Sequence, residues 1–231
     1  MEKSNRYDVI FFDAGATLFD IYPNRQTRFC NAARKFGLQV SEEAAIAAYR
    51  RMDEWITRLG DIAVRNREDE DLLWLEFYGR ILENLGVKEE DGHLVGAIAQ
   101  ECMYTRWCYL FPETLEVLEE LAQSHRLAVI SNAYPSMVEA LDGLGVRRFF
   151  ERFFISAYVG ASKPDAIIFL HALSEMGVSA GVAAFVDDLE PNVQGGANVG
   201  IGSFLLDRAG KHPQSNLPRI ESLKELVKAV R

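Results

Sequence analysis

The stretch Tyr-Asp-Val-Ile-Phe-Phe-Asp-Ala-Gly, residues 7–15, is the feature on which the fold depends. Its first six residues form an apolar, β-branched and aromatic run that stops at Asp13, with Gly15 close behind. A short apolar run bounded by a turn signal is typical of a buried strand. The sequence therefore predicts a strand over residues 7–12 with Asp13 at its carboxyl end.

From about residue 22 to about residue 108 the strong patterns are helical. Ser41 is a candidate N-cap with two glutamates after it, and a helical face follows it up to Gly60. A second stretch places apolar residues on one face and ends at Gly86. The members of that second face are Leu72, Leu75, Tyr78, Ile81, Leu82 and Leu85. We expect about four helices in this segment.

After Phe111-Pro112 the pattern changes to short apolar runs that alternate with helical stretches, which is typical of parallel βαβ units. The expected strands are 127–130, 153–155, 183–186 and 203–206, and the expected helices lie near 112–123, 135–144, 165–176 and 192–199. We predict an α/β protein: a Rossmann-like parallel sheet with helices on both faces, residues 1–20 and 109–231, and a helical bundle, residues 21–108. Ligands of such sheets bind beyond the carboxyl ends of the strands, where the bundle could act as a lid.

Composition excludes several classes of partner. The formal net charge of −9, with no long Lys/Arg cluster, argues against nucleic acid and against anionic membranes. The apolar run near the N-terminus is too short for a signal peptide or a membrane span. Three cysteines without a C-x-x-C pair suggest neither a disulfide framework nor a zinc site, so a reducing cytoplasm is expected.

Polar residues follow three of the expected strands. Asp13 ends the first, Ser131-Asn132 follows Ile130, and Asp187-Asp188 follows Val186, while Lys163 precedes Pro164 at a helix start. Carboxylates, a hydroxyl and one ammonium at neighbouring strand ends suit a hard cation and a phosphoryl group. Each residue also has a purely structural interpretation, as a helix cap, turn former or solvated charge, but their coincidence favours chemistry.

The four groups together resemble the motifs of the haloacid dehalogenase superfamily. Phe-Phe-Asp13-Ala-Gly-Ala-Thr17-Leu is similar to its first motif, Val-Ile-Ser131-Asn to its second, Ser-Lys163-Pro-Asp to its third and Phe-Val-Asp187-Asp188-Leu-Glu-Pro-Asn192 to its fourth. They occur in the family's order over about residues 7–208. The helical segment matches the family's helical cap in position and helicity.

The resemblance implies a role for each residue. Asp13 would be the nucleophile and form an aspartyl-phosphate. Mg²⁺ would be held by Asp13, Asp187, the Gly15 carbonyl and the neighbouring Asp188. The phosphoryl oxygens would be held by Ser131, the backbone around Asn132, and Lys163, which also tempers the carboxylates, while Thr17 would orient the loop beside the substrate. The implied substrate is a small phosphorylated metabolite.

Gly15 departs from the family's phosphatases. They usually carry there a second aspartate that protonates the leaving oxygen and then activates water, and glycine can do neither. General acid–base help is worth about 10²–10⁴-fold in rate, so ordinary phosphomonoesterase activity should be slow. Ala16 also replaces the usual glycine of this loop.

Two further functional hypotheses arise from Gly15. The first is cleavage of a carbon–phosphorus or a carbon–halogen bond. Family members that lack the aspartate include phosphonate hydrolases, which use a cap lysine to form an imine, and haloacid dehalogenases, which need no metal. The expected cap holds only Lys35 and Lys88, and neither is an obvious buried imine former. Dehalogenases have no acidic pair at the fourth motif, so Asp187-Asp188 favours a metal-dependent reaction at phosphorus. The second hypothesis is a binding or regulatory protein that keeps the phosphoryl pocket but hydrolyses its ligand poorly.

Other residues have bland interpretations. Asn192 could cap its helix or line the site. The arginines at 50, 51, 58, 65 and 67 alternate with acids and suggest a solvated helix surface. The aromatic residues Trp55, Trp74, Tyr78, Tyr104 and Trp107 are expected in the bundle core, and one or two of them could face a substrate. Nothing in the sequence specifies the substrate or the oligomeric state.

Overall fold

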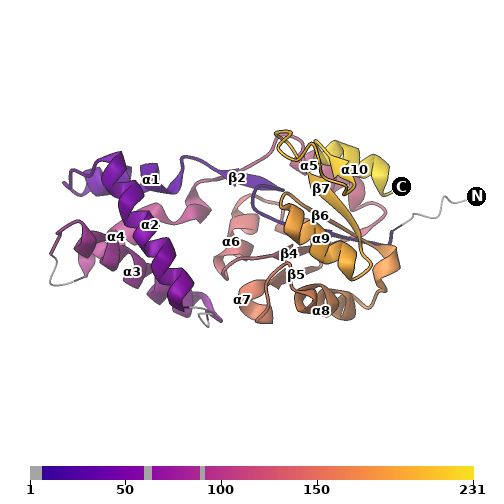
Figure 1. Ribbon diagram of the computed structural model, residues 1–231, viewed down its shortest axis with the longest axis horizontal. Helices are drawn as coiled ribbons and strands as arrows, with labels where there is room; N and C mark the ends of the chain where they lie inside the picture. The colour runs from indigo at the N-terminus through magenta and orange to yellow at the C-terminus, as the bar shows by residue number, and fades with distance from the viewer. Residues whose placement is uncertain (1–6, 60–63, 89–91) are drawn as a thin grey trace, which may run out of the picture. The chain divides into compact units, whose positions relative to one another are not determined.

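The computed structural model describes residues 7–59, 64–88 and 92–231. The chain divides into two compact units (Figure 1). We call residues 1–20 with 109–231 the core unit and residues 21–108 the helical unit. The chain passes between them at two short strands, β2 (Phe19–Ile21) and β3 (Cys108–Leu110), which pair with each other.

The described part of the core unit contains a six-stranded sheet in which every pair of neighbours is parallel. This confirms the predicted α/β class. The strand order is β5-β4-β1-β6-β7-β8. Their bounds are β1 Val9–Phe12, β4 Arg126–Ser131, β5 Arg152–Ile155, β6 Ala183–Asp187, β7 Gly202–Leu206 and β8 Arg219–Ile220.

The register of β1 decides where chemistry can occur. Phe12 lies opposite Val129 of β4 on one side and Val186 of β6 on the other. Parallel strands bring their carboxyl ends to one edge, so the residues that follow these three positions lie together there. All four residues of β1 are buried, which explains why it reads as a continuous apolar run.

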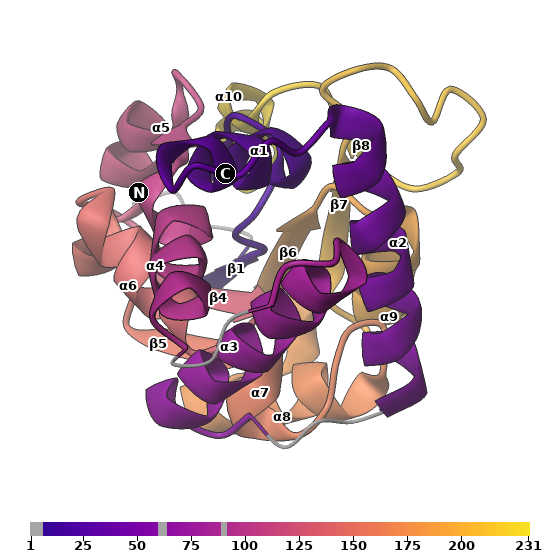
Figure 2. The same ribbon diagram turned by 90° about the vertical axis from the view of Figure 1, so that its left-hand side faces the viewer.

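Helices cover both faces of this sheet. Val9 and Phe11 of β1 pack in one cluster with α8, while Ile10 and Phe12 point to the opposite face. Figures 1 and 2 show α5 and α10 on one side of the sheet and α8 on the other. The helices are α5 Thr114–Leu121, α6 Ser136–Gly143, α7 Ser156–Val159, α8 Ala166–Met176, α9 Glu190–Asn198 and α10 Leu223–Ala229.

In the part of the helical unit that the structure describes, four helices pack as a bundle (Figure 2). They are α1 Arg25–Lys35, α2 Glu42–Leu59, α3 Arg67–Asn84 and α4 His93–Cys102. Side chains of Asn24, Ser41 and Asn66 accept backbone N–H bonds at the starts of α1, α2 and α3. Large buried aromatic residues, Phe29, Tyr49, Phe77 and Tyr78, dominate the bundle core.

The predicted buried face of α3 is wrong at its beginning. Leu72 is 61% exposed and Leu75 is 39% exposed, whereas Leu73 and Phe77 are buried. Apolar residues surround much of this helix, so spacing alone allows faces that differ by one residue, or about 100°. Packing selects the face that carries Phe77, because an aromatic ring buries the larger apolar area.

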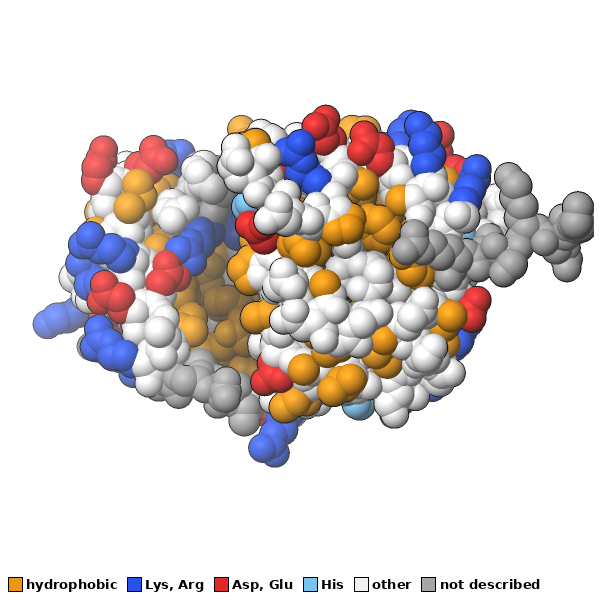
Figure 3. Space-filling model, turned by 45° about the vertical axis from the view of Figure 1, so that its right-hand side comes forward, with side chains coloured by type: hydrophobic (Ala, Val, Ile, Leu, Met, Phe, Trp, Pro, Cys, Tyr) orange, Lys and Arg blue, Asp and Glu red, His pale blue; other side chains and the backbone are white. Residues whose placement is uncertain are grey.

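Four of the five predicted solvated arginines, at 50, 51, 58 and 65, are exposed. Arg67 corrects the prediction, because it is half-buried and its Nη1 atom lies beside the fully buried Glu70. Arg58 pairs with Glu54 at 3.4 Å, and Arg67 pairs with Glu70 and Asp71 within its own helix. Figure 3 shows blue and red side chains interspersed over the helical unit. Among the helices that the structure describes, none combines the length and apolar character needed to cross a membrane.

Gly195 of α9 passes very close to Pro164, the residue after Lys163. A Cβ atom at position 195 would lie 2.6 Å from the Pro164 carbonyl oxygen. Alanine normally stabilises a helix by about 1 kcal/mol over glycine. Here we expect Gly195→Ala to lower the free energy of unfolding by about 1–3 kcal/mol, because the backbone must move apart.

Urea denaturation measures this free energy. Gly181→Ala is the matched control, because a Cβ there meets nothing within 4 Å. An unchanged or increased stability for Gly195→Ala would contradict the close approach.

Candidate active site

Asp13 lies at the carboxyl end of β1, in the middle of the sheet. Its backbone N–H donates to the Val186 carbonyl at 2.9 Å, which continues the strand pairing past Phe12. Its side chain is buried, with Ser131 of β4 on one side and Asp187 of β6 within reach on the other. Strand pairing therefore positions this carboxylate between two motifs that are distant in sequence.

Lys163 joins two of the carboxylates. Its Nζ atom donates to Asp13 Oδ1 at 2.7 Å, to Asp187 Oδ2 at 2.6 Å and to the Ile130 carbonyl at 2.8 Å. Burial lowers the pKa of this lysine, but the attraction of both carboxylates outweighs burial, so the net pKa is raised. The ammonium therefore stays charged and neutralises part of the acidic cluster.

Asn132 fixes the loop that carries Lys163. Its side-chain Nδ2 donates to the Lys163 carbonyl at 2.8 Å, and the Lys163 backbone N–H donates to Asn132 Oδ1 at 2.7 Å. Ser131 makes a long hydrogen bond of 3.5 Å from Oγ to Asp13 Oδ1. The side chain of Asn132 is thus committed to Lys163, whereas the Ser131 hydroxyl sits beside the carboxylate.

Three carboxylates form a cluster that could hold a metal ion. One oxygen each from Asp13, Asp187 and Asp188 lie within 4.8 Å of one another. Two of these residues are buried and Asp188 is half-buried. With Lys163 counted, the formal charge of the group is −2, which a divalent cation would balance. Carboxylate oxygens are the ligands that Mg²⁺ prefers, so the residues fit this ion.

Asp187 is the most tightly held member of the cluster. The Leu189 backbone N–H donates to its Oδ1 at 2.8 Å, and Asn192 Nδ2 contacts both of its oxygens at 3.2 and 3.1 Å. Asn192 therefore lines the site, which resolves the two interpretations of this residue. Burial raises the pKa of Asp187 to about 6, and the charge of Asp13 adds to the shift against the opposing effect of Lys163. Burial and Asp13 also raise the pKa of Asp188.

The loop after Asp13 turns back on itself. The Ala16 N–H donates to the Phe19 carbonyl at 2.7 Å, and Ala16 has a φ of 61°. This left-handed conformation costs a non-glycine residue about 1–2 kcal/mol, which gives a physical reason for the glycine usual at this position. Thr17 is buried, and its hydroxyl has no hydrogen-bond partner among the described residues.

Arg208 anchors this loop and was not anticipated from the sequence. Its Nη2 donates to the Thr17 carbonyl at 3.0 Å, its guanidinium lies 3.9 Å from the centre of the Phe111 ring, and it pairs with Glu113. These residues come from three distant segments, so no local pattern could have revealed the contact.

Gly15 leaves an open space. A Cβ atom at this position would meet nothing within 4 Å, and Gly15 does not have a positive φ. The backbone would therefore accept a side chain. The two lysines of the helical unit do not offer a buried amine, because Lys35 is exposed and pairs with Glu101 at 2.8 Å and Lys88 is exposed.

The class of protein follows from comparison with known families. A model of the haloacid dehalogenase-like hydrolases matches residues 7–200. This chain belongs to that family, and it is a hydrolase.

Individual relatives of known name are similar to this chain at moderate to low identity. Haloacid dehalogenase-like hydrolase domain-containing protein 3 of Mus musculus is 40% identical over 103 residues, which cover 44% of this chain and only 40% of that protein. The glyceraldehyde 3-phosphate phosphatase of Methanopyrus kandleri is 27% identical over 241 residues, covering 94% of this chain and 97% of the relative. The HAD-hydrolase YfnB of Bacillus subtilis, solved bound to magnesium, has a TM-score of 0.70 at 20% identity, covering 98% of this chain and 99% of that one. The structural likeness shows a shared fold.

The raised pKa of Asp187 predicts pH-dependent metal binding. A cation binds the ionised carboxylate, so protons compete with it as the pH falls through about 6. We expect the dissociation constant for Mg²⁺ to be nearly constant above pH 7 and to rise by about tenfold per pH unit well below the pKa.

Calorimetric titration between pH 5 and 8 at constant ionic strength measures this dependence. Asp142→Asn, an exposed change in α6, should keep the wild-type profile. A dissociation constant that stays flat down to pH 5 would contradict the proposed involvement of Asp187.

Proposed function

We propose that this protein is a Mg²⁺-dependent phosphohydrolase that acts on a small phosphorylated metabolite. The observation that carries the proposal is the meeting of Asp13, Lys163, Asp187 and Asp188 at the carboxyl edge of one parallel sheet. A buried carboxylate beside a charged ammonium and a cation-binding cluster suits nucleophilic attack on an anionic phosphoryl group.

In this proposal Asp13 is the nucleophile. One of its oxygens forms a bond to phosphorus, and the bond from phosphorus to the substrate oxygen breaks, so that the leaving group takes the electron pair. Water then attacks phosphorus, breaks the aspartyl-phosphate bond and regenerates the carboxylate with release of inorganic phosphate. Dividing one difficult displacement into two steps lowers the barrier of each.

Lys163 and Ser131 orient the nucleophile and stabilise charge. Both donate to Oδ1 of Asp13, which restricts rotation of the carboxylate. Their donors, with backbone groups around Asn132, would also stabilise the negative charge of the transferred phosphoryl group. Thr17, whose hydroxyl is buried and unpaired among the described residues, would orient the loop beside the substrate.

Asp13, Asp187, Asp188 and the Gly15 carbonyl would hold the magnesium ion. When bound, the ion neutralises the repulsion between the carboxylate and the phosphoryl group and polarises the latter. Asn192 keeps Asp187 in place by contacting both of its oxygens.

Gly15 limits the rate in this proposal. It has no side chain to protonate the leaving oxygen or to activate water, so those proton transfers fall to solvent. Good leaving groups should therefore react much faster than poor ones, because they need less proton donation.

The comparisons support the phosphatase class. The relative from Methanopyrus kandleri, which matches nearly the whole chain, is named for a small phosphate ester, and YfnB of Bacillus subtilis holds magnesium. The exposed lysines of the helical unit give no support to an imine mechanism. We further propose that the helical unit is the cap of this hydrolase. The three free cysteines agree with the predicted cytoplasmic location.

Turnover of a panel of phosphorylated metabolites and of p-nitrophenyl phosphate, with and without Mg²⁺, tests the proposal. We expect metal-dependent release of phosphate that Asp13→Asn reduces to background. Asp142→Asn is the control, because it replaces an exposed carboxylate without touching the site. Metal-independent turnover, or full activity in Asp13→Asn, would contradict the proposal.

Gly15→Asp tests the role of the missing aspartate. The open space at this position should admit the new side chain, and restored general acid–base catalysis should raise kcat by about 10²–10⁴-fold for esters with poor leaving groups. Activity that appears only in Gly15→Asp would instead support a natural protein that binds phosphorylated ligands with little turnover. Halide release from haloacids without metal would favour the dehalogenase hypothesis.

A further inference from the structure

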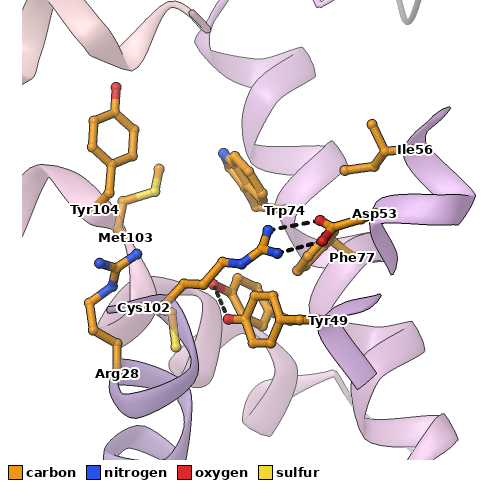
Figure 4. Close-up of a pocket in the computed structure, with 11 residues that line it drawn as sticks. Arg28, Tyr49, Asp53, Ile56, Trp74, Phe77, Cys102, Met103 and Tyr104 are labelled. Atoms are coloured by element: carbon orange, nitrogen blue, oxygen red, sulfur yellow. Dashed lines mark hydrogen bonds and ion pairs between the residues drawn. The ribbon is translucent and has the colours of Figure 1, made fainter. Parts of the chain in front are cut away.

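The helical unit contains a pocket of its own (Figure 4). Its cavity volume is about 110 Å³, and the pocket is open to solvent. Every residue that lines it belongs to the helical unit. A cavity of about 150 Å³ encloses benzene, so this smaller, open space suits one flat ring whose edge extends into solvent.

The two arginines of the pocket differ in their partners. Arg25 donates to both oxygens of Asp53, so its charge is balanced. Arg28 is only 7% exposed, and the only hydrogen bond that its side chain makes to a described residue runs from Nη1 to the Pro23 carbonyl at 2.9 Å. Its Nε atom is buried with no acceptor among the described residues. The pocket therefore carries one buried positive charge without a carboxylate.

Among the described residues, no carboxylate pairs with the Arg28 side chain. Tyr49 and Cys102 are in electrostatic contact with it, and burial raises the pKa of both. Both therefore stay neutral near pH 7. A buried cation without a counterion is costly, so a ligand that supplies a negative charge beside it would be stabilised.

The walls of the pocket are largely aromatic and apolar. Figure 4 shows Arg28, Met103 and Tyr104 on one side and Trp74, Phe77 and Ile56 toward the other. The indole N–H of Trp74 donates to Glu70 at 3.1 Å, and the hydroxyls of Tyr49 and Tyr78 lie 3.3 Å apart and bond to each other. With these polar tips occupied, the rings offer flat apolar surfaces.

We propose that this pocket binds a small organic monoanion, a carboxylate on a single flat ring, with the guanidinium of Arg28 paired to the carboxylate. The charge of the pocket decides between anions. Arg25 and Asp53 cancel, which leaves one positive charge, and this matches a carboxylate better than a phosphate monoester of about −1.5 to −2. Arginine also presents its N–H groups in a fork that fits a carboxylate. The proposal rests on residues of the helical unit alone.

Titration of the full-length protein with benzoate, followed through ¹³C-methyl methionine signals, tests it. Met103 lines the pocket, whereas Met137 and Met176 are buried in the core unit. We expect benzoate to move the Met103 signal in a saturable way and to leave the other two unmoved. Benzyl alcohol, with the same ring and no charge, should bind at least about tenfold more weakly. Equal binding of both compounds, or no saturable shift of Met103, would overturn the proposal.

Three variants locate the charge. Arg28→Met keeps the length of the side chain without its charge and should weaken benzoate binding by about tenfold or more. Arg28→Lys keeps the charge without the fork, and its affinity for benzoate should lie between those of the wild type and Arg28→Met. This variant also tests the assignment if Arg28→Met folds poorly. Arg34→Met removes an exposed arginine from the same helix and should bind like the wild type. Loss of binding in Arg34→Met, or wild-type binding in both Arg28 variants, would contradict the assignment.

Phenylphosphonate distinguishes the two sources of anionic charge. It carries the same ring with a phosphoryl-type group, and we expect it to bind the pocket more weakly than benzoate near pH 8, where it is a dianion. Stronger binding of phenylphosphonate, sensed at Met103, would overturn the choice of a carboxylate.

Discussion

The contact on which the rest of the core unit depends is the ammonium of Lys163 between Asp13 and Asp187. Three carboxylates at the end of one sheet would repel one another strongly in a buried site, and a single cation reduces that repulsion. The lysine itself is held by its environment, because Asn132 bonds to its backbone on both sides of the residue. Gly195 has no side chain, which lets α9 approach Pro164, the residue after Lys163. This close approach helps to position the Lys163 ammonium.

The two units differ in where they place their polar residues. The core unit places its polar residues at strand ends, where parallel pairing brings distant segments to one edge. The described part of the helical unit is built of packed helices, and the polar residues of its pocket lie between them. Arg25 and Arg28 are three residues apart on α1, yet within the described ranges only Arg25 pairs with an acidic side chain. A surplus positive charge inside a chain of net charge −9 is therefore a local property of the bundle.

The loop between Asp13 and Phe19 shows how two small residues change a site without changing its fold. Ala16 adopts a left-handed conformation that glycine would adopt more easily, while Gly15 leaves space that a side chain could fill. The loop keeps its path because backbone bonds close it and Arg208 holds the Thr17 carbonyl. Family membership thus establishes a hydrolase framework, and we propose that the lack of a side chain at position 15 limits proton transfer within it.

The sequence by itself determined the α/β class, the principal strands and helices of the core unit, and the candidate residues at strand ends, because these depend on local periodicity and on short motifs. It failed to identify β8, α7 and α10, which have only two, four and seven residues and too little periodicity to stand out. Tertiary structure decided which face of α3 is buried, that Asn192 contacts Asp187, and that Trp74, Tyr78 and Tyr104 line a pocket with Arg28. Such features depend on contacts between residues far apart in the chain, and a local pattern carries no information about which distant side chain will meet it.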